Sequence, residues 1–181
     1  MIMKRHILIL TAILSLAAGC ASMKPNLSQI PGHYTYQHGW SYDTKEGHIE
    51  VNETGTMDYY PDGSALDLAR QVYVMTCPDG GRVTWVFNYV SPSRWRAEGS
   101  DFYFAGIENS FRMTLLETRT EGGVDKIWAD KQAHRVMKNV GSSIGRETKF
   151  NIAKLTQEQF VWSYTYPDGH TDTWEFEKIF R

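Results

Sequence analysis

The stretch MDYYPDGSALDL at 57–68 places two alternating apolar runs on either side of Pro-Asp-Gly. The same three residues recur in VMTCPDGGRVTW at 74–85 and in SYTYPDGHTDTW at 163–174. Proline fixes φ near the value that the first central residue of a turn needs, aspartate bonds to nearby backbone, and glycine accepts positive φ. Each copy therefore predicts a tight β-hairpin, built on a type I turn with a glycine bulge. Turn chemistry accounts for the three aspartates without a catalytic or metal-binding role.

Outside these corners, apolar and polar residues alternate along most of the chain, and this pattern predicts β-strands. In RVTWVFNY at 82–89, for example, Val83, Trp85, Phe87 and Tyr89 share one face. Segment 122–141 instead spaces its apolar residues as an amphipathic helix does. We expect strands near 33–41, 47–60, 64–76, 82–90, 100–108, 111–119, 147–155, 159–166 and 170–180, with a short extra piece at 93–97.

The two edge strands of such a sheet would have unpaired backbone groups, which favours closure of the sheet into a barrel. A barrel removes both edges, whereas a two-layer sandwich only shields them. We therefore predict an all-β fold, an antiparallel meander β-barrel of 8–10 strands with one amphipathic helix near 122–141. A two-layer antiparallel β-sandwich is the alternative. A barrel of this size is either filled by side chains or holds one small ligand.

The first 20 residues, MIMKRHILILTAILSLAAGC, have the charged start, short apolar core and small residues of a secretory signal. The ending LAAGC at 16–20 resembles the lipobox of bacterial lipoproteins, which implies cleavage before Cys20 and acylation of that cysteine. Two or more acyl chains anchor a protein stably. We expect a signal peptide over 1–19, a lipidated Cys20 with a tether over 20–29, and a single barrel domain over 30–181. An ordinary signal peptide with an incidental cysteine is the alternative.

Charge and cysteine content narrow the function further. The formal net charge of −2 becomes about −4 once Lys4 and Arg5 leave with the signal. A mildly acidic chain without a basic run has no electrostatic footprint for nucleic acid. Cys77 has no partner if Cys20 is acylated, so stability must come from the core. Ala21 beside the cysteine resembles an outer-membrane sorting signal, which implies an envelope protein that faces the periplasm.

Three phrases resemble lipocalins and bacterial lipocalin-like lipoproteins. IPGHY at 30–34 resembles the Gly-Xaa-Trp start of lipocalins, with Tyr34 in place of tryptophan, and ETGTMDYYPDGS at 53–64 resembles a second-hairpin phrase of the lipoproteins. IAKLTQEQFVW at 152–162 resembles the way in which such chains end. The helix departs from the family, because lipocalins place it after the eighth strand. The resemblance implies a barrel that binds small apolar molecules.

Two charged residues, Glu53 and Arg70, interrupt rows of apolar residues in neighbouring predicted strands. Counting outward from the corner at 61–63 places them roughly opposite one another. Either they bind the polar head of a ligand, or they form a structural salt bridge, or a bulge turns one of them outward. The ligand-binding candidates are Glu53, Arg70, Trp85, Phe87, Tyr89, Trp162, Tyr164 and Trp174.

These residues favour a membrane-anchored envelope lipoprotein that binds a small, mostly apolar ligand inside its barrel. The alternative is a non-enzymatic interaction or structural module with a filled barrel that contacts another envelope protein. Gly-Xaa-Ser-Xaa-Gly at 141–145 matches a nucleophile elbow, but it follows a predicted helix where the elbow needs a strand. The histidines lack zinc-site spacing. We therefore expect no catalytic residue, metal or cofactor.

Overall fold

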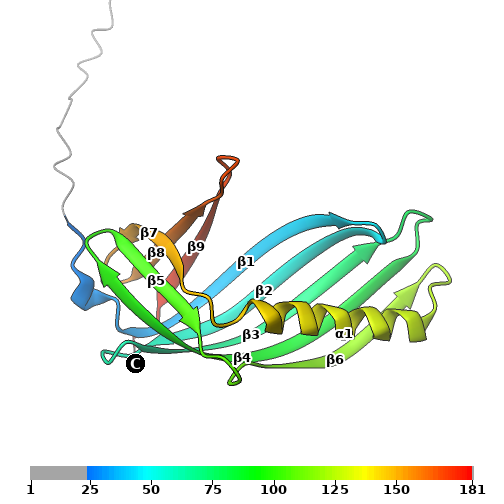
Figure 1. Cartoon of the computed structure of the whole chain (residues 1–181), viewed down its shortest axis with the longest axis horizontal. Helices are drawn as coiled ribbons and strands as arrows, with labels where there is room; N and C mark the ends of the chain where they lie inside the picture. Colours follow the sequence, from blue (N-terminus) through cyan, green and yellow to red (C-terminus); the bar gives the residue numbers. More distant parts are fainter. Residues whose placement is uncertain (1–23, 181) are drawn as a thin grey trace, which may run out of the picture.

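Nine antiparallel strands and one α-helix form the part of the chain that the computed structural model describes, residues 24–180 (Figure 1). The predicted signal segment and Cys20 lie outside the described residues. The elements are η1 (Leu27–Gln29), β1 (Gly32–Thr44), β2 (Gly47–Tyr59), β3 (Ser64–Thr76), β4 (Arg82–Glu98), β5 (Asp101–Gly106), β6 (Arg112–Glu121), α1 (Lys126–Ser143), β7 (Thr148–Leu155), β8 (Gln159–Thr165) and β9 (Thr171–Lys178). No helix within this range is long and apolar enough to cross a bilayer.

The three Pro-Asp-Gly corners have one geometry, as predicted. At each corner the glycine has a φ of 83–88°, and the aspartate carboxylate accepts a hydrogen bond from the backbone N–H two residues later. The corners join β2 to β3, β3 to β4 and β8 to β9. Their residues are Asp62 and Gly63, Asp79 and Gly80, and Asp168 and Gly169.

Eight of the strands close into an antiparallel barrel. The strand order is β3-β2-β1-β9-β8-β7-β5-β4, and β4 pairs back onto β3 along 13 residues of register. The predicted all-β barrel with one helix is therefore confirmed, and the sandwich alternative is wrong. The closed eight-stranded antiparallel barrel is compatible with a lipocalin-like fold.

The strand order departs from a simple meander at β6. Strand β4 is 17 residues long, so its free edge has room for two partners. Its last residues, 93–98, pair with β5, whereas 82–90 pair with β6. The predicted piece at 93–97 is thus the end of β4 itself. As a result one half of the molecule is closed, and β1, β2, β3, β4 and β6 continue beyond it as an open curved sheet (Figure 1).

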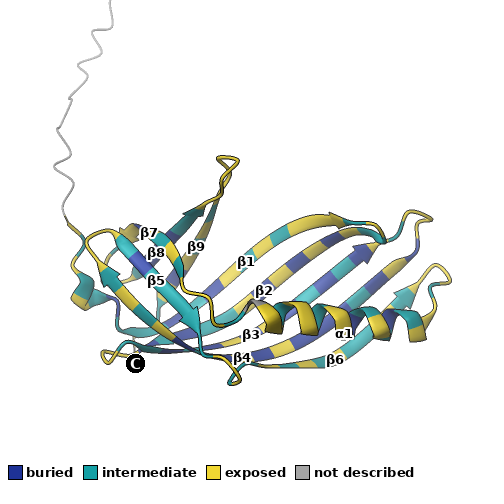
Figure 2. Cartoon of the chain, in the orientation of Figure 1, coloured by how far each residue is buried: buried dark blue, intermediate teal, exposed yellow. Residues whose placement is uncertain are grey.

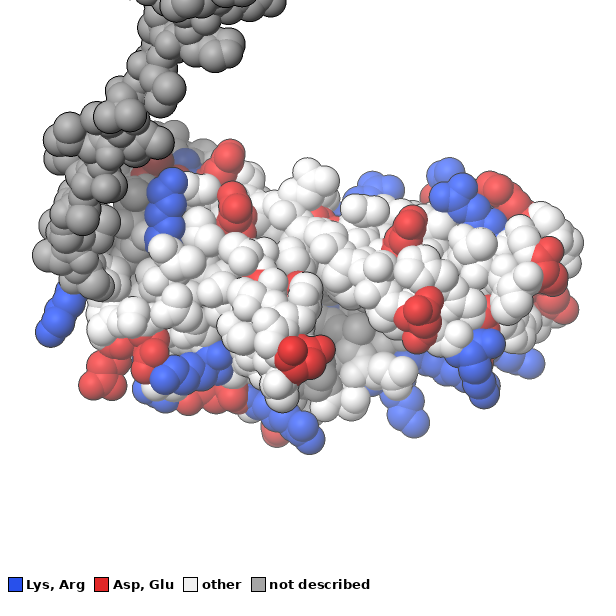
Figure 3. All heavy atoms as spheres, turned by 90° about the horizontal axis from the view of Figure 1, so that it is seen from above, with Lys and Arg blue, Asp and Glu red and all other residues white. Residues whose placement is uncertain are grey.

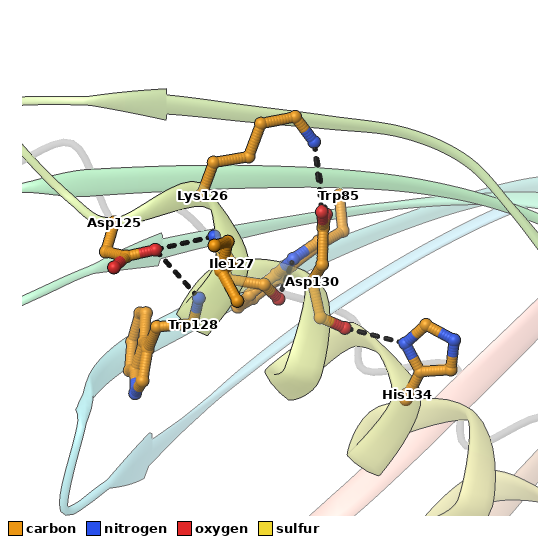
Figure 4. A network of polar contacts seen from close by, with 8 residues as sticks. Trp85, Asp125, Lys126, Ile127, Trp128, Asp130 and His134 are labelled. Atoms are coloured by element: carbon orange, nitrogen blue, oxygen red, sulfur yellow. Dashed lines mark hydrogen bonds and ion pairs between the residues drawn. The ribbon is translucent and has the colours of Figure 1, made fainter.

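Helix α1 lies across the open part of the sheet (Figure 1). The Asp125 carboxylate caps it, accepting hydrogen bonds from the backbone N–H groups of Ile127 at 2.6 Å and Trp128 at 3.1 Å (Figure 4). Ala129 and Ala133 are fully buried against the sheet, and the indole N–H of Trp85 donates to the Ala129 carbonyl at 3.0 Å. Small residues let the helix approach the sheet closely. Because α1 runs through Ser143 and leads into β7, the order is helix then strand, the reverse of a nucleophile elbow.

Two hydrophobic cores follow from this division. In the closed half, aromatic rings fill the barrel: Phe160 is fully buried, and its ring centroid lies 5.1–6.3 Å from those of Tyr34, Tyr59, Phe102 and Phe176. In the open half, Val83, Trp85 and Phe87 of β4 are buried beneath α1. Figure 2 shows the alternation of buried and exposed residues along the long strands.

The more apolar row of β3 faces outward. The apolar row Leu66, Leu68, Val72 and Val74 lies on the outer face, where Leu68 is 41% exposed. The inner row is the less hydrophobic one, Ala65, Asp67, Ala69, Gln71, Tyr73 and Met75. Hydrophobicity alone would place the more apolar row in the core, but this strand directs the Asp67 carboxyl group and the Gln71 amide inward.

Candidate ligand-binding site

A cleft opens where β1 and β9 separate. The two strands pair only over Tyr34–Tyr36 and Phe176–Lys178. Beyond that point β1 continues with β2 into the open sheet, while the β8–β9 hairpin projects away (Figure 1). The cleft in this fork has a volume of about 680 Å³ and is lined by His38, Gly39, Trp40, Ser41, Glu53, Tyr166, Asp168, His170, Asp172 and Trp174.

A stack of flat rings forms one wall of the cleft. The His38 ring lies between those of Trp40 and Trp174, at centroid distances of 5.4 and 4.7 Å. Behind Trp174 the stack continues to Trp162 at 4.6 Å and on to Phe102 at 5.9 Å from Trp162. Burial lowers the pKa of His38, although Glu53 and Asp172 act in the opposite direction. His38 is therefore a neutral, rigidly stacked ring at pH 7.

The β8–β9 hairpin forms the opposite wall. Asp172 accepts a hydrogen bond from the Tyr166 hydroxyl at 2.9 Å and contacts Nε2 of His170 at 3.1 Å. Partial burial and the Asp172 carboxylate raise the pKa of Tyr166 to about 12. The Tyr166 and His170 rings are themselves stacked, with centroids 5.8 Å apart. This wall thus presents aromatic rings and carboxylate oxygens together.

The floor of the cleft reaches a buried cluster of two carboxyl and two phenol groups. Glu53 and Asp67 are each 8% exposed. The Tyr36 hydroxyl contacts Glu53 Oε1 at 2.6 Å and Asp67 Oδ1 at 2.8 Å, and the Tyr89 hydroxyl contacts Glu53 Oε1 and Asp67 Oδ2, both at 2.7 Å. The Gln71 amide donates to Glu53 Oε2 at 2.6 Å. We call Tyr36, Glu53, Asp67 and Tyr89 the acid cluster.

The acid cluster has more oxygen contacts than phenol protons. Its two hydroxyl groups, which lie 3.0 Å apart, take part in five oxygen–oxygen contacts of 2.6–3.0 Å but carry only two protons. A further proton on a carboxyl group relieves the shortage of donors. Burial, together with the charge of Glu53, raises the pKa of Asp67 to about 7. The Asp67 carboxyl group is therefore protonated below about pH 7.

Gly55 allows Tyr36 to reach the cluster. The strand register places Tyr36 opposite Gly55 on β2, and Gly55 opposite Ala69 on β3. A Cβ atom at Gly55 would lie 2.8 Å from two atoms of the Tyr36 ring, closer than packed carbon atoms approach. Because neither position has a large side chain, the phenol can extend across β2 until its hydroxyl contacts Asp67 on β3.

Of the eight predicted ligand-binding residues, Glu53 and Trp174 line the cleft. Tyr89 belongs to the acid cluster, and Trp162 supports Trp174 from behind. Trp85 and Phe87 instead lie in the core beneath α1. Tyr164 packs between Phe150 and Tyr166, at 5.8 and 4.8 Å.

Of the interpretations left open for Glu53 and Arg70, the salt bridge does not form. The register places Glu53 opposite Gln71, and Arg70 opposite Thr54 on the outer face, where Arg70 is exposed. An error of one residue reverses the face of a side chain, because the period of a strand is two.

Sequence reasoning missed Tyr36, His38 and Asp67. Asp67 could have been found once Glu53 was placed opposite Gln71. It is the acidic residue of β3 that lies on the same face as Gln71. His38 and Trp40 likewise share a parity on β1. Within the described residues, no group of three or more His, Cys, Asp or Glu side chains is arranged to hold a metal ion.

Comparison with known proteins adds no relative. No protein-family model matches the chain, and a search of curated proteins finds no similar sequence. The site must therefore be interpreted from its own geometry.

Gly55→Ala tests the close approach of Tyr36. The added methyl group must displace the phenol, so we expect a loss of about 1–3 kcal/mol in the free energy of unfolding, measured by urea denaturation. Gly141→Ala is the control, because a Cβ atom there meets nothing within 4 Å; its effect should be within about 1 kcal/mol and stabilising. Equal effects of the two substitutions would contradict the packing that we describe.

The raised pKa of Asp67 predicts a pH dependence of stability. Its value of about 7 in the folded protein exceeds the value of about 3.9 for an unfolded chain, so the folded state holds a proton that the unfolded state has lost. Raising the pH from about 4 to 7 should lower the free energy of unfolding by up to about 1.4 kcal/mol per pH unit, and the decrease should level off above about pH 7. Asp67→Asn should remove this contribution, and Glu50→Gln, at an exposed position of β2, should retain it. Identical pH profiles for Asp67→Asn and the parent protein, measured by urea denaturation, would refute the assignment.

Proposed function

We propose that this protein is a lipid-anchored binding protein of the bacterial cell envelope, which holds a small, mostly apolar ligand in the cleft between β1 and the β8–β9 hairpin. The carrying observation is the cleft itself, about 680 Å³ in volume, with stacked rings on one wall and carboxylates on the other. Ligand sites are typically concave and aromatic, with a few placed polar groups.

The packing of the barrel favours the cleft over the barrel interior as the ligand site. Tyr34, Phe102 and Phe160 are fully buried in the barrel core. Opening space among them would cost a large part of the core packing energy, because truncating one such ring costs about 3–5 kcal/mol. A ligand in the cleft needs no such rearrangement, which is why the ligand predicted for the barrel interior is proposed here for the fork.

The start of the described chain is compatible with an anchor at Cys20. Ile30 is fully buried in the barrel core, the Tyr34 hydroxyl donates to its carbonyl at 2.8 Å, and Lys178 Nζ donates to the carbonyls of Gln29 and Pro31. Because the chain is fixed to the barrel from this point, a lipid on Cys20 would hold the domain within a few tens of Å of the membrane, at about 3.5 Å per extended residue. Attachment to the outer membrane on its periplasmic side is part of the proposal.

A second candidate is a non-enzymatic module that contacts another envelope protein. It is favoured by the exposed apolar pair Leu68 and Val90 on the outer face, 41% and 39% exposed and directly opposite one another on β3 and β4. Leu116 of β6, which is 52% exposed, lies beside a bulge in the β4–β6 pairing.

Tryptophan fluorescence distinguishes the two candidates. Protein freed of lipid should show saturable quenching at a micromolar concentration of retinol, an uncharged amphiphile that the acidic lining does not repel. Trp174→Ala should weaken binding of this amphiphile at least about tenfold, equivalent to about 1.4 kcal/mol. Trp128→Ala, on α1, is the matched control and should retain binding. The second candidate would replace the first if no quenching occurs and a protein partner co-purifies. That partner should then be lost from the Leu68→Asp variant.

Labelled palmitate tests the anchor. A bacterial host that makes the full chain should incorporate the label and keep the protein in its membrane fraction. Cys20→Ser should lose the label and release the protein, because no other acylation site is proposed, while Cys77→Ser should keep both properties. Label retained in Cys20→Ser would refute the anchor.

A further inference from the structure

The formal charges that line the cleft all have one sign. Glu53, Asp168 and Asp172 are acidic, and the lining includes no Lys or Arg. On the face seen in Figure 3, acidic and basic side chains both occur and are separated by uncharged surface. Aromatic rings also line the cleft, at Trp40, Tyr166 and Trp174. Ring faces attract cations, most strongly where water is excluded.

Within residues 24–180, the buried carboxyl pair has no cationic partner. In that range, side-chain hydrogen bonds reach Glu53 and Asp67 only from Tyr36, Gln71 and Tyr89, which are all neutral. Among the ion pairs of the described residues, none includes Glu53 or Asp67. A buried carboxylate without a counter-charge is costly, so it must either hold a proton or meet a cation.

The proton of this pair is the one able to move. Burial raises the pKa of the surrounding phenols well above 10, so they keep their protons at neutral pH; they are Tyr36, Tyr59, Tyr73 and Tyr89. Burial lowers the pKa of His38, so this histidine, which lies opposite Glu53 in the β1–β2 register, is already neutral. Asp172, the remaining charged group near His38, is held by Tyr166 and His170 on the hairpin. The proton on the Asp67 carboxyl group is therefore the one that can leave when a ligand binds.

We infer that the cleft binds an organic cation whose charge takes the place of the proton on the Asp67 carboxyl group, which two phenols link to Glu53. The cation lies against the rings of the cleft with its positive charge toward Glu53, and the carboxyl proton leaves to solvent. The pair then carries one more negative charge, which the cation balances. This inference rests on the proposed function, since it specifies the ligand class of the same cleft.

Calorimetry with two probes of equal shape tests the charge requirement. Choline and its neutral isostere 3,3-dimethyl-1-butanol differ in the ammonium nitrogen, so at pH 8 choline should bind at least tenfold more tightly. Below pH 7 its apparent Kd should rise about tenfold per pH unit, because one proton competes with the cation. Equal affinities for the two probes would overturn the inference.

Two buffers that both take up protons near pH 6 but differ in ionisation enthalpy, phosphate and MES, report the proton directly. At pH 6 choline binding should release close to one proton from the parent protein and from Asp58→Asn, a control on the outer face of β2. Asp67→Asn should bind choline without releasing a proton and with a Kd that varies little with pH. Choline binding by the parent without proton release would overturn the exchange.

Failure of the inference can be distinguished from failure of the proposed function. If neither probe binds while amphiphiles still quench tryptophan fluorescence, the cleft is a ligand site of another class, and the inference is wrong alone. If neither the probes nor the amphiphiles bind, both are wrong.

Discussion

The acid cluster constrains the register of four consecutive strands. Tyr36 comes from β1, Glu53 from β2, Asp67 from β3 and Tyr89 from β4, and their oxygens meet within 2.6–3.0 Å. A slip of one residue in any of these strands would turn its member toward the outer face, leaving buried carboxyl groups without donors. The cluster lies where the aromatic core of the barrel meets the core beneath α1. Hydrogen bonding at this layer therefore links the closed and open halves of the sheet.

Two long strands produce those halves. Strand β4 pairs with β5 at one end and with β6 at the other, and β1 pairs with β9 over three residues while pairing with β2 along its whole length. Each strand is thus a point where the sheet divides. Near β4 and β6, α1 covers the concave surface of the open sheet. Its residues Ala129 and Ala133 permit close packing. At the division between β1 and β9, the stacked rings of His38, Trp40 and Trp174 border a cleft instead.

Local signals made most of the fold predictable. The Pro-Asp-Gly corners and the period of two fixed the strands and three hairpins, because both depend on neighbouring residues only. The position of β6 was not predictable in this way, since it depends on the length of β4 relative to its partners. The inner face of β3 could not be read from hydrophobicity, because the more apolar row, which contains Leu68, lies outside. At the site, Glu53 was recognisable as a charge in an apolar row, but its partner is a second acid, Asp67. A search for opposite charge selects Arg70 and cannot find two acids that are bridged by two phenols.

The cost of the acid cluster bears on whether this protein is a binding protein or a purely structural module. A structural layer between two cores could consist of apolar residues of similar volume, and replacing buried charged groups in that way is often neutral or stabilising. Glu53 and Asp67 instead bring two acids together in a dry environment. Such departures from the rules of stable packing concentrate at functional sites. One of the two, Glu53, extends to a cleft bordered by aromatic rings. A buried acid that lowers stability but also lines a cleft can contact a ligand there. In a module with a filled barrel it would have no such role, and this favours the ligand-binding function.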